Sequence, residues 1–415
     1  MIEYKEHTLD NGLKVIFHRD RSTPLAAVNL IYRVGSRNES AQKTGFAHLF
    51  EHLMFSGSKH VPDFDGPIQM ACGDNNAFTN ADYTDYYMTL PTSNLETALW
   101  LESDRMQWLN INAHSLDVQR RVVIEEFNQR YLNQPYGDLW LLIRPMAYKI
   151  HPYRWSTIGM TPEHIANATL DDVREFYDRF YSPQNAILSI VADSDEQAVL
   201  DKVNKWFRDI ESKKSVVSEI EQEPIQTEAR RLSVVRSVPV SVVTIVYHMA
   251  ARTSRKFHVS DVISDLLSNG NSSRLYTRLV QQQRLCTSVN AYITGDQDPG
   301  LFVVTGHVAQ GHTVEEVENA LLQQLEELKN NPVSDYELQK VKNKFETGAT
   351  FGDINIMNKA MNLGFYSMLG DTGLINKEVS IYKSVTQEEI MQTAKEMFRP
   401  ENSSTLLYLT EDETK

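Results

Sequence analysis

The sequence predicts an α+β fold of two homologous domains, each a mostly antiparallel sheet with helices packed on it. The prediction rests on a repeated segment late in each half, a repeated strand early in each half, and a charged stretch between the halves. Strands and helices are segregated within each half without a strict βαβ rhythm, which is typical of α+β proteins. The 415 residues are enough for two or three domains of roughly 150 residues each.

The late repeat begins at Thr169 and returns at Thr386, an offset of 217 residues. The two copies read TLDDVREFYDRFYSPQNAILSIVAD and TQEEIMQTAKEMFRPENSSTLLYLTED, and Asn185 in the first matches Asn402 in the second. Each copy predicts an amphipathic helix with a threonine N-cap, a stop that contains a proline, and then a strand. We therefore expect the same helix–strand unit in both halves.

The early repeat pairs AAVNLIYRVG, which contains Tyr32, with SVVTIVYHMA, which contains Tyr247, at an offset of 215 residues. Both segments have the length and the β-branched residues of a strand. The stretch ESKKSVVSEIEQEPIQTEARR between the halves is charged and has no sustained apolar period, which predicts a linker. We expect an N-terminal domain over residues 1–210, a linker over 211–231 and a C-terminal domain over 232–415.

The N-terminal domain is predicted to open with a β-hairpin in HTLDNGLKVIF. Asp10, Asn11 and Gly12 supply its turn, because this kind of sequence favours the tight turns that join antiparallel strands. Helical segments then dominate the middle of each half, and a strand returns near its end.

The charge and the cysteine content bear on the class of protein. The formal net charge of −14 argues against a nucleic-acid partner, which favours a basic face. The acidity either steers cationic peptides to the protein or only keeps it soluble. No run approaches the roughly 20 apolar residues of a membrane span, so we expect no membrane association. Two distant cysteines, Cys72 and Cys286, favour a cytoplasmic protein, or a periplasmic one if a signal segment has been removed.

The segment GFAHLFEHLMFSG predicts a buried helix that ends at Gly57 and presents two imidazoles on one face. His48 and His52 are four residues apart and so share a face, with Glu51 at its edge. The remaining side chains are apolar, and burying two histidines and a carboxylate among them is costly without partners. A divalent ion with its bound water satisfies all three groups, and zinc suits these ligands. Glu51 is then the base that takes a proton from that water.

The alternative is a chance pattern in a core helix. The order H-x-x-E-H is, however, the inverse of the commoner zinc motif H-E-x-x-H. A third ligand has to come from elsewhere, and SLDVQRRVVIEEFNQRYLNQ predicts a second helix with Ser115 as its N-cap. Glu125 and Glu126 lie in the middle of this helix, and periodicity alone leaves open which of them faces inward, or whether both are solvated.

HLFEH followed by VVIEEF resembles the M16 family of metallopeptidases, which includes pitrilysin, insulysin and mitochondrial processing peptidase. The resemblance covers essentially the whole chain, including NGLKVIF and NAFTNADYTDYYMTLP. It implies a zinc endopeptidase in which His48, His52 and Glu126 hold Zn²⁺ and Glu51 is the catalytic base. The family often carries a glutamate seven residues before the third ligand, where this chain has Gln119.

The resemblance also implies that Asn76, Ala77 and Thr79 belong to an edge strand that pairs with the main chain of a peptide substrate, as in β-augmentation. The alternative for Asn76 is a turn residue that follows Gly73. Short members of the family work as dimers of two-domain subunits, so the expected partners are a peptide and a second subunit.

The C-terminal half is not expected to repeat the zinc site, because Asp261, Ser264 and Asp265 face the three motif residues in the repeat alignment. Family members also commonly carry an arginine and a tyrosine that grip the substrate and help to stabilise the oxyanion. The matching positions here are Val280 and Thr287, and the nearby Arg284 is out of register. We therefore expect a heterodimer whose other subunit supplies this pair, with a homodimer as the alternative.

Two other classes of function remain as alternatives. The first is a non-catalytic structural subunit of an M16-like assembly, although a scaffold has no physical need for the intact set of motif residues. The second is a metal-binding interaction module. Zinc content and the effect of changing Glu51 separate these alternatives from the peptidase.

Overall fold

The computed structural model describes residues 1–213 and 219–411, so residues 214–218 of the expected linker lie outside the described part. The chain divides into two compact units, and each of them is discontinuous in sequence. The first unit comprises Met1–Asn128, Trp155–Glu221 and Thr350–Lys377, and the second comprises Gln129–Arg154, Gln222–Ala349 and Glu378–Lys415.

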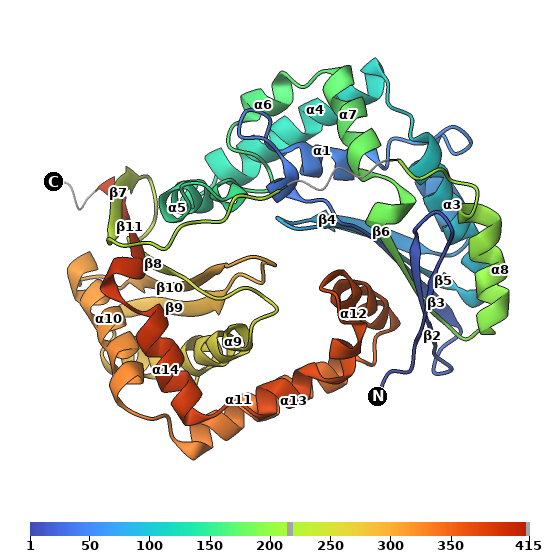
Figure 1. Cartoon of the computed structure of the whole chain (residues 1–415). Coiled ribbons are helices and arrows are strands. Elements are labelled where there is room, and N and C mark those ends of the chain that lie inside the picture. Colours follow the sequence, from blue (N-terminus) through green and yellow to red (C-terminus); the bar gives the residue numbers. More distant parts are fainter. Residues whose placement is uncertain (214–218, 412–415) are drawn as a thin grey trace. The chain divides into compact units, whose positions relative to one another are not determined.

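The first unit contains a sheet with the strand order β1-β2-β6-β3-β5-β4 (Figure 1). Strands β2 and β6 pair in parallel, and the other neighbours pair antiparallel. The expected hairpin is confirmed, because β1 pairs with β2 across a turn in which Gly12 has a φ of +86°. The strands are β1 (Lys5–Thr8), β2 (Lys14–Arg19), β3 (Leu25–Tyr32), β4 (Asp74–Thr79), β5 (Thr84–Pro91) and β6 (Ala186–Ala192).

The second unit contains a sheet with the order β7-β11-β8-β10-β9, in which β7 and β11 pair in parallel and the other neighbours antiparallel. This order repeats that of the first sheet from β2 to β4, strand by strand. The predicted duplication and the mostly antiparallel sheets are therefore confirmed. The strands are β7 (Arg230–Arg236), β8 (Val242–His248), β9 (Cys286–Ile293), β10 (Leu301–Val308) and β11 (Ser403–Thr410).

The late repeat is preserved down to single hydrogen bonds. The side-chain nitrogen of Asn185 donates to the carbonyl oxygen of Phe180 at 2.8 Å, at the junction between the repeat helix and β6. In the second copy, Asn402 donates to the carbonyl oxygen of Met397 at 2.8 Å, before β11. In both copies the preceding helix begins at a threonine that forms a capping box. The asparagine thus satisfies the last helical carbonyls and fixes where the strand starts.

Helices cover both sheets. The first unit has α1 (Phe46–Leu53), α2 (Asp65–Met70), α3 (Leu95–Trp108), α4 (Ala113–Phe127), α6 (Pro162–Ala166), α7 (Leu170–Phe180), α8 (Glu196–Phe207) and α12 (Ile356–Met368). The second has α5 (Leu139–Ala147), α9 (Arg255–Ser268), α10 (Val314–Asn330), α13 (Glu378–Lys383) and α14 (Gln387–Met397), and most of α11 (Asp335–Gly352). None of the described helices is both long and apolar enough to cross a bilayer.

Two equivalent helices are exchanged between the halves of the chain. Helix α12 belongs to the C-terminal half of the sequence but packs on β3 and β6 of the first sheet. Helix α5, which begins 217 residues earlier, packs on β11 and β7 of the second sheet. The expected ranges 1–210 and 232–415 place each sheet in its own half of the chain. They do not account for the exchange of α5 and α12 between the two units. Strand β7 also begins at Arg230, inside the range expected for the linker.

Helix α12 approaches its sheet closely. A Cβ atom at Gly364 would lie 2.7 Å from Oδ1 of Asn29, so only a glycine permits this contact. Nζ of Lys359, earlier in α12, donates to the buried carboxylate of Asp20 at 2.5 Å. Burial raises the pKa of Asp20, but the hydrogen bonds from Lys359 and Ser22 outweigh it and lower the pKa to about 2.

Candidate metal centre

Helix α1 carries His48, Glu51 and His52 and is held firmly by aromatic packing. The ring of Phe50 on its buried face stacks on Phe176 of α7, with ring centroids 4.9 Å apart. The helix ends at Leu53, earlier than expected, and the chain then turns to Gly57, whose φ is +89°. The positions of the three functional side chains are thus set by a short helix with a fixed buried face.

The two histidines of α1 converge on Glu126 of α4. Oε2 of Glu126 lies 3.6 Å from Nε2 of His48 and 3.4 Å from Nε2 of His52. The two imidazole rings are 4.9 Å apart and nearly perpendicular. Within residues 1–213 and 219–411, this is the only group of histidine, cysteine or acidic side chains whose ligand atoms lie close enough to hold a metal ion. The structure therefore brings together the three ligands that the sequence analysis named.

The choice between Glu125 and Glu126 is decided by the rotation of α4. Glu125 is exposed, whereas the side chain of Glu126 is only 17% exposed and faces the histidines. The helix begins at Ala113 with Asn112 as its N-cap, so the expectation of an N-cap at Ser115 is wrong. Oδ1 of Asn112 accepts the backbone N–H of Ser115 at 3.0 Å, and Ser115 completes the capping box instead.

Gln119 lies two turns before Glu126 and links α4 to the segment after α1. Its side-chain nitrogen donates to Oγ of Ser56 at 3.2 Å. The position thus carries a neutral hydrogen-bond donor between the two helices that supply the candidate ligands. A contact of this kind fixes the distance between α1 and α4 without adding charge near the histidines.

The donor set suits zinc. Two imidazole nitrogens and one carboxylate oxygen are ligands of catalytic zinc sites, which leave a fourth position for water. Two ligands that bond a tetrahedral zinc ion at about 2.0–2.1 Å lie roughly 3.3–3.4 Å apart. The distances of 3.6 and 3.4 Å between Glu126 and the two histidines are close to that separation. The residues therefore fit the ion without a rearrangement of the helices.

Glu51 is half-buried and lies on α1 between the two histidines in sequence. Burial raises the pKa of Tyr87 on β5, and the negative charges of Asp85, Asp74 and Glu51 raise it further. Helix α1 contacts β4, the strand on which Asn76 pairs with Tyr87. A base on α1 is thus carried by the same short helix as the two histidines, and this helix contacts an edge strand of the sheet.

Strand β4 forms that edge, and β5 is its partner in the described sheet. The N–H of Asn80 donates to the carbonyl oxygen of Tyr83 at 3.0 Å, at the end of the β4–β5 hairpin. Hydrogen-bonded and non-hydrogen-bonded pairs alternate in antiparallel strands. The main-chain groups of Ala77 and Thr79 consequently face the open edge. The Ala77 N–H donates to Oδ1 of Asn76 at 2.8 Å, and Asn76 is a strand residue, so its alternative assignment to a turn is wrong.

A hollow of about 450 Å³ lies beside β4 within the first unit. Asp74, Asn75 and Tyr87 line one side of it, and the apolar side chains of the segment 354–357 line another. Its walls offer a carboxylate together with apolar surface.

The equivalent region of the second unit holds no comparable ligand set among the described residues. On α9, Asp261 accepts a hydrogen bond from the hydroxyl of Tyr382 at 2.6 Å, and Asp265 lies 3.4 Å from Nζ of Lys344. These carboxylates already have partners within the protein.

The two positions expected for an arginine and a tyrosine also lie in the second unit. Val280 is in the π-helical turn Tyr276–Gln282, and Thr287 is on the edge strand β9. The side chain of valine has no hydrogen-bond donor, and the hydroxyl of threonine cannot reach as far from the main chain as that of tyrosine. Neither residue can replace the pair directly.

Comparisons with known proteins find matches to both halves of the chain. A family model described as Insulinase (Peptidase family M16) matches residues 14–152, which contain all four residues of the candidate centre. A second model, described as Peptidase M16 inactive domain, matches residues 167–345. The zinc protease PqqE of Helicobacter pylori is 32% identical over 346 residues, which cover 82% of this chain and 78% of that protein.

Further similarities extend over nearly the full length of the chain. The uncharacterized zinc protease YmxG of Bacillus subtilis is 21% identical, and the match covers 97% of this chain and 98% of that protein. The crystal structure of a protease from Helicobacter pylori is similar with a TM-score of 0.94 at 28% identity, covering 99% of this chain and 100% of that one. The fold therefore has a counterpart in a solved protease structure, and the sequence is similar to proteins named as zinc proteases.

Proposed function

This chain belongs to peptidase family M16, and on that premise we propose that it is the zinc-bearing subunit of an endopeptidase that cleaves extended or unfolded peptides. The observation that supports the proposal best is the convergence of His48, His52 and Glu126, with Glu51 on the same helix. A scaffold protein gains nothing from this arrangement, because buried histidines and carboxylates cost free energy unless they bind something.

The proposed substrate contact is main-chain pairing along β4. The open edge presents the main-chain groups of Ala77 and Thr79. A peptide that adds to this edge gains hydrogen bonds that do not depend on its sequence, which suits unfolded substrates. The peptide carbonyl oxygen displaces Oδ1 of Asn76 from the Ala77 N–H, so Asn76 protects this donor until a substrate arrives.

The proposed chemistry follows from the position of Glu51. Zinc bound at the centre would acidify its water and polarise the peptide carbonyl. Glu51 takes a proton from the water as its oxygen bonds to the carbonyl carbon, and it then returns the proton to the nitrogen that leaves when the C–N bond breaks. Oε2 of Glu126 and the two imidazoles would hold the ion that supplies this chemistry.

The proposal includes a homologous partner subunit. An oxyanion donor typically contributes about 3–4 kcal/mol to the transition state, and Val280 and Thr287 cannot supply it in the expected way. We infer that a second M16-type subunit provides the arginine and the tyrosine, so that this chain works as part of a heterodimer. The competing function is a non-catalytic structural subunit, which the missing arginine and tyrosine at positions 280 and 287 also favour.

The test measures cleavage of an unfolded peptide by three samples. They are the chain alone, the chain mixed with a homologous subunit that carries the arginine and the tyrosine, and the Glu51→Gln variant mixed with the same subunit. The proposal predicts about one zinc per chain, little cleavage of an unfolded peptide by the chain alone, and strong cleavage in the mixture. Glu51→Gln keeps the zinc but abolishes the gain. Strong activity of the pure chain would overturn the heterodimer, and absence of zinc and of cleavage in the mixture would overturn the peptidase.

A further inference from the structure

The start of α1 has no capping side chain of its own. Its N-cap residue is Gly45, in the left-handed region with a φ of +88°. A Cβ atom there would lie 2.6 Å from the carbonyl oxygen of Ile158, so the position excludes residues with side chains. The first backbone N–H groups of a helix lack partners within the helix and need an acceptor from outside.

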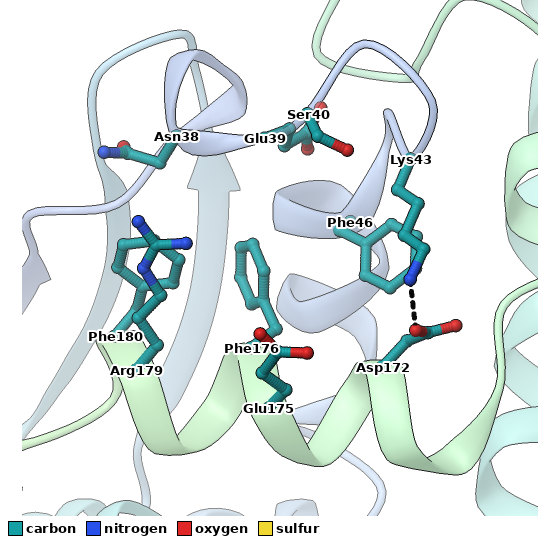
Figure 2. A pocket seen from close by; sticks show the side chains of 10 residues that line it. All are labelled: Asn38, Glu39, Ser40, Lys43, Phe46, Asp172, Glu175, Phe176, Arg179 and Phe180. Atoms are coloured by element: carbon teal, nitrogen blue, oxygen red, sulfur yellow. Dashed lines mark hydrogen bonds and ion pairs between the residues drawn. The ribbon is translucent and has the colours of Figure 1, made fainter. Parts of the chain in front are cut away.

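Glu39 supplies this acceptor from a preceding loop. Its Oε2 accepts the N–H of Gly45 at 2.9 Å, and its Oε1 accepts the N–H of Ala47 at 2.8 Å. The side chain is buried, and Figure 2 shows it beside Phe46 at the first turn of the helix. Burial raises the pKa of Glu39 to about 8, so the two hydrogen bonds rather than a full negative charge hold the start of the helix. The sequence analysis missed this residue, because a cap from outside the helix has no fixed spacing.

The consequence for the metal centre follows from the length of α1. The helix has eight residues, and the N–H that Glu39 binds at Ala47 immediately precedes His48. A shift of the first turn therefore moves both imidazoles relative to Glu126. We propose that Glu39 is a positioning residue of the metal centre: its carboxylate fixes the first turn of α1 and thereby aims His48 and His52 at Glu126. This inference rests on the proposed zinc function.

Glu39 binds the first turn of α1, and the nearby Lys43 has another partner. Glu39 lines a cavity of about 220 Å³ together with residues of α7 (Figure 2). Lys43, also in this cavity, forms its ion pair with Asp172 at the start of α7. Glu175 projects from α7 into the same cavity and is exposed. The cavity thus contains a second glutamate that is exposed, and its substitution serves as the control for a change of charge at the same cavity.

The test measures metal binding and its geometry, apart from catalysis. Wild type, Glu39→Gln and the control Glu175→Gln are stripped of metal, and their dissociation constants for Zn²⁺ are determined by competition with a chelating dye. The visible spectrum of each protein loaded with Co²⁺ reports the geometry of the ligands. Glutamine keeps the size of the side chain but replaces one acceptor oxygen with a donor, so that one N–H of α1 loses its partner.

The proposal predicts that Glu39→Gln weakens Zn²⁺ binding by about tenfold, in the range of residues that orient metal ligands. It also predicts an altered Co²⁺ spectrum and a lower kcat with an unchanged KM in the complete enzyme. Glu175→Gln should match wild type in each measurement. If Glu39→Gln does not fold, Glu39→Asp, which keeps the carboxyl group but shortens its reach, is measured in its place and should show the same changes.

The outcomes separate this inference from the proposed function. A wild-type chain that binds neither Zn²⁺ nor Co²⁺ overturns both. A wild-type chain that binds zinc, together with a folded Glu39 variant whose affinity and Co²⁺ spectrum equal those of wild type, overturns the positioning role alone. A variant that only lowers the unfolding temperature, with the metal site unchanged, also overturns it, because that result describes a residue with a purely structural role.

Discussion

The carboxylate oxygen Oε2 of Glu126 lies 3.4 Å from Nε2 of His52, although the two residues belong to different helices. The adjacent Glu125 is exposed. Two neighbouring glutamates on α4 are thus placed in different environments by the rotation of one helix. The account of function depends on this difference, and it can be tested with single-atom changes because glutamine is nearly isosteric with glutamate.

Glu51→Gln should remove the base and leave the metal centre intact. General-base catalysis typically contributes about 10²- to 10⁴-fold to a rate, so we expect a loss of kcat of that size in the assembled enzyme. Zinc content should equal that of wild type, since Glu51 is not among the converging ligands. Peptide hydrolysis and elemental analysis of the same samples check both points. A variant that retains its cleavage rate would favour the metal-binding interaction module.

Ala77→Pro should weaken substrate binding without unfolding the sheet. The Ala77 N–H faces the open edge of β4, where a proline removes no bond to β5. We expect KM for an unfolded peptide to rise about tenfold, the effect of losing about one good hydrogen bond. Asn76→Ala is the control, because it uncovers the same N–H and should not raise KM. Equal KM values for wild type and the proline variant would exclude main-chain pairing at this point.

Val280→Arg combined with Thr287→Tyr should give activity to the chain alone. The pair restores the side chains that the family commonly carries at these positions. Because an oxyanion donor is worth about 10²- to 10³-fold in kcat, we expect at least a tenfold gain in kcat/KM of the purified chain. Arg284→Ala should have no effect, since that residue is out of register. An unchanged rate in a double variant that binds zinc normally would contradict the assignment of these two positions.

Lys359→Met should destabilise the protein and flatten its acid dependence. The pKa of Asp20 is lowered from 3.8 to about 2 in the folded state, so this carboxylate stabilises the fold above about pH 4, and the contribution is lost as the pH falls through 2. We expect the variant to lose about 2 kcal/mol of unfolding free energy at pH 7. Urea titrations at pH 7, 4 and 2.5 measure this.

Lys377→Met is the matched control for that prediction. Its partner Asp371 lies 3.3 Å away, but the two side chains are 61% and 51% exposed, so the pair should contribute less than about 1 kcal/mol. A wild-type stability that does not change between pH 4 and 2.5 would mean that Asp20 is not held by Lys359 in solution.

The sequence was informative wherever a local pattern decides the structure. The repeat at Thr169 and Thr386 predicted two equivalent helix–strand units, because caps and β-branched runs act over a few residues. The spacing of His48 and His52 placed them on one helical face for the same reason. These features needed no knowledge of which segments meet in space.

Other features depend on distant contacts and could not be read from local patterns. The apolar side of α12 indicates that it packs on something, but not that it covers β3 and β6 of the first sheet. Glu39 lies in a loop, and nothing in its neighbourhood shows that it caps α1. The choice of Glu126 over Glu125 came from the family resemblance, and it agrees with the rotation of α4, which is set by contacts along its whole length.

The most direct test of the account is the zinc content of Glu126→Gln against Glu125→Gln, each purified with wild type in the presence of Zn²⁺ and dialysed. The account predicts about one zinc per chain in wild type and Glu125→Gln. Glu126→Gln should retain little zinc, with a dissociation constant at least a hundredfold weaker, because a buried anionic ligand has been lost. Equal zinc in all three proteins, or a loss confined to Glu125→Gln, would contradict the central claim.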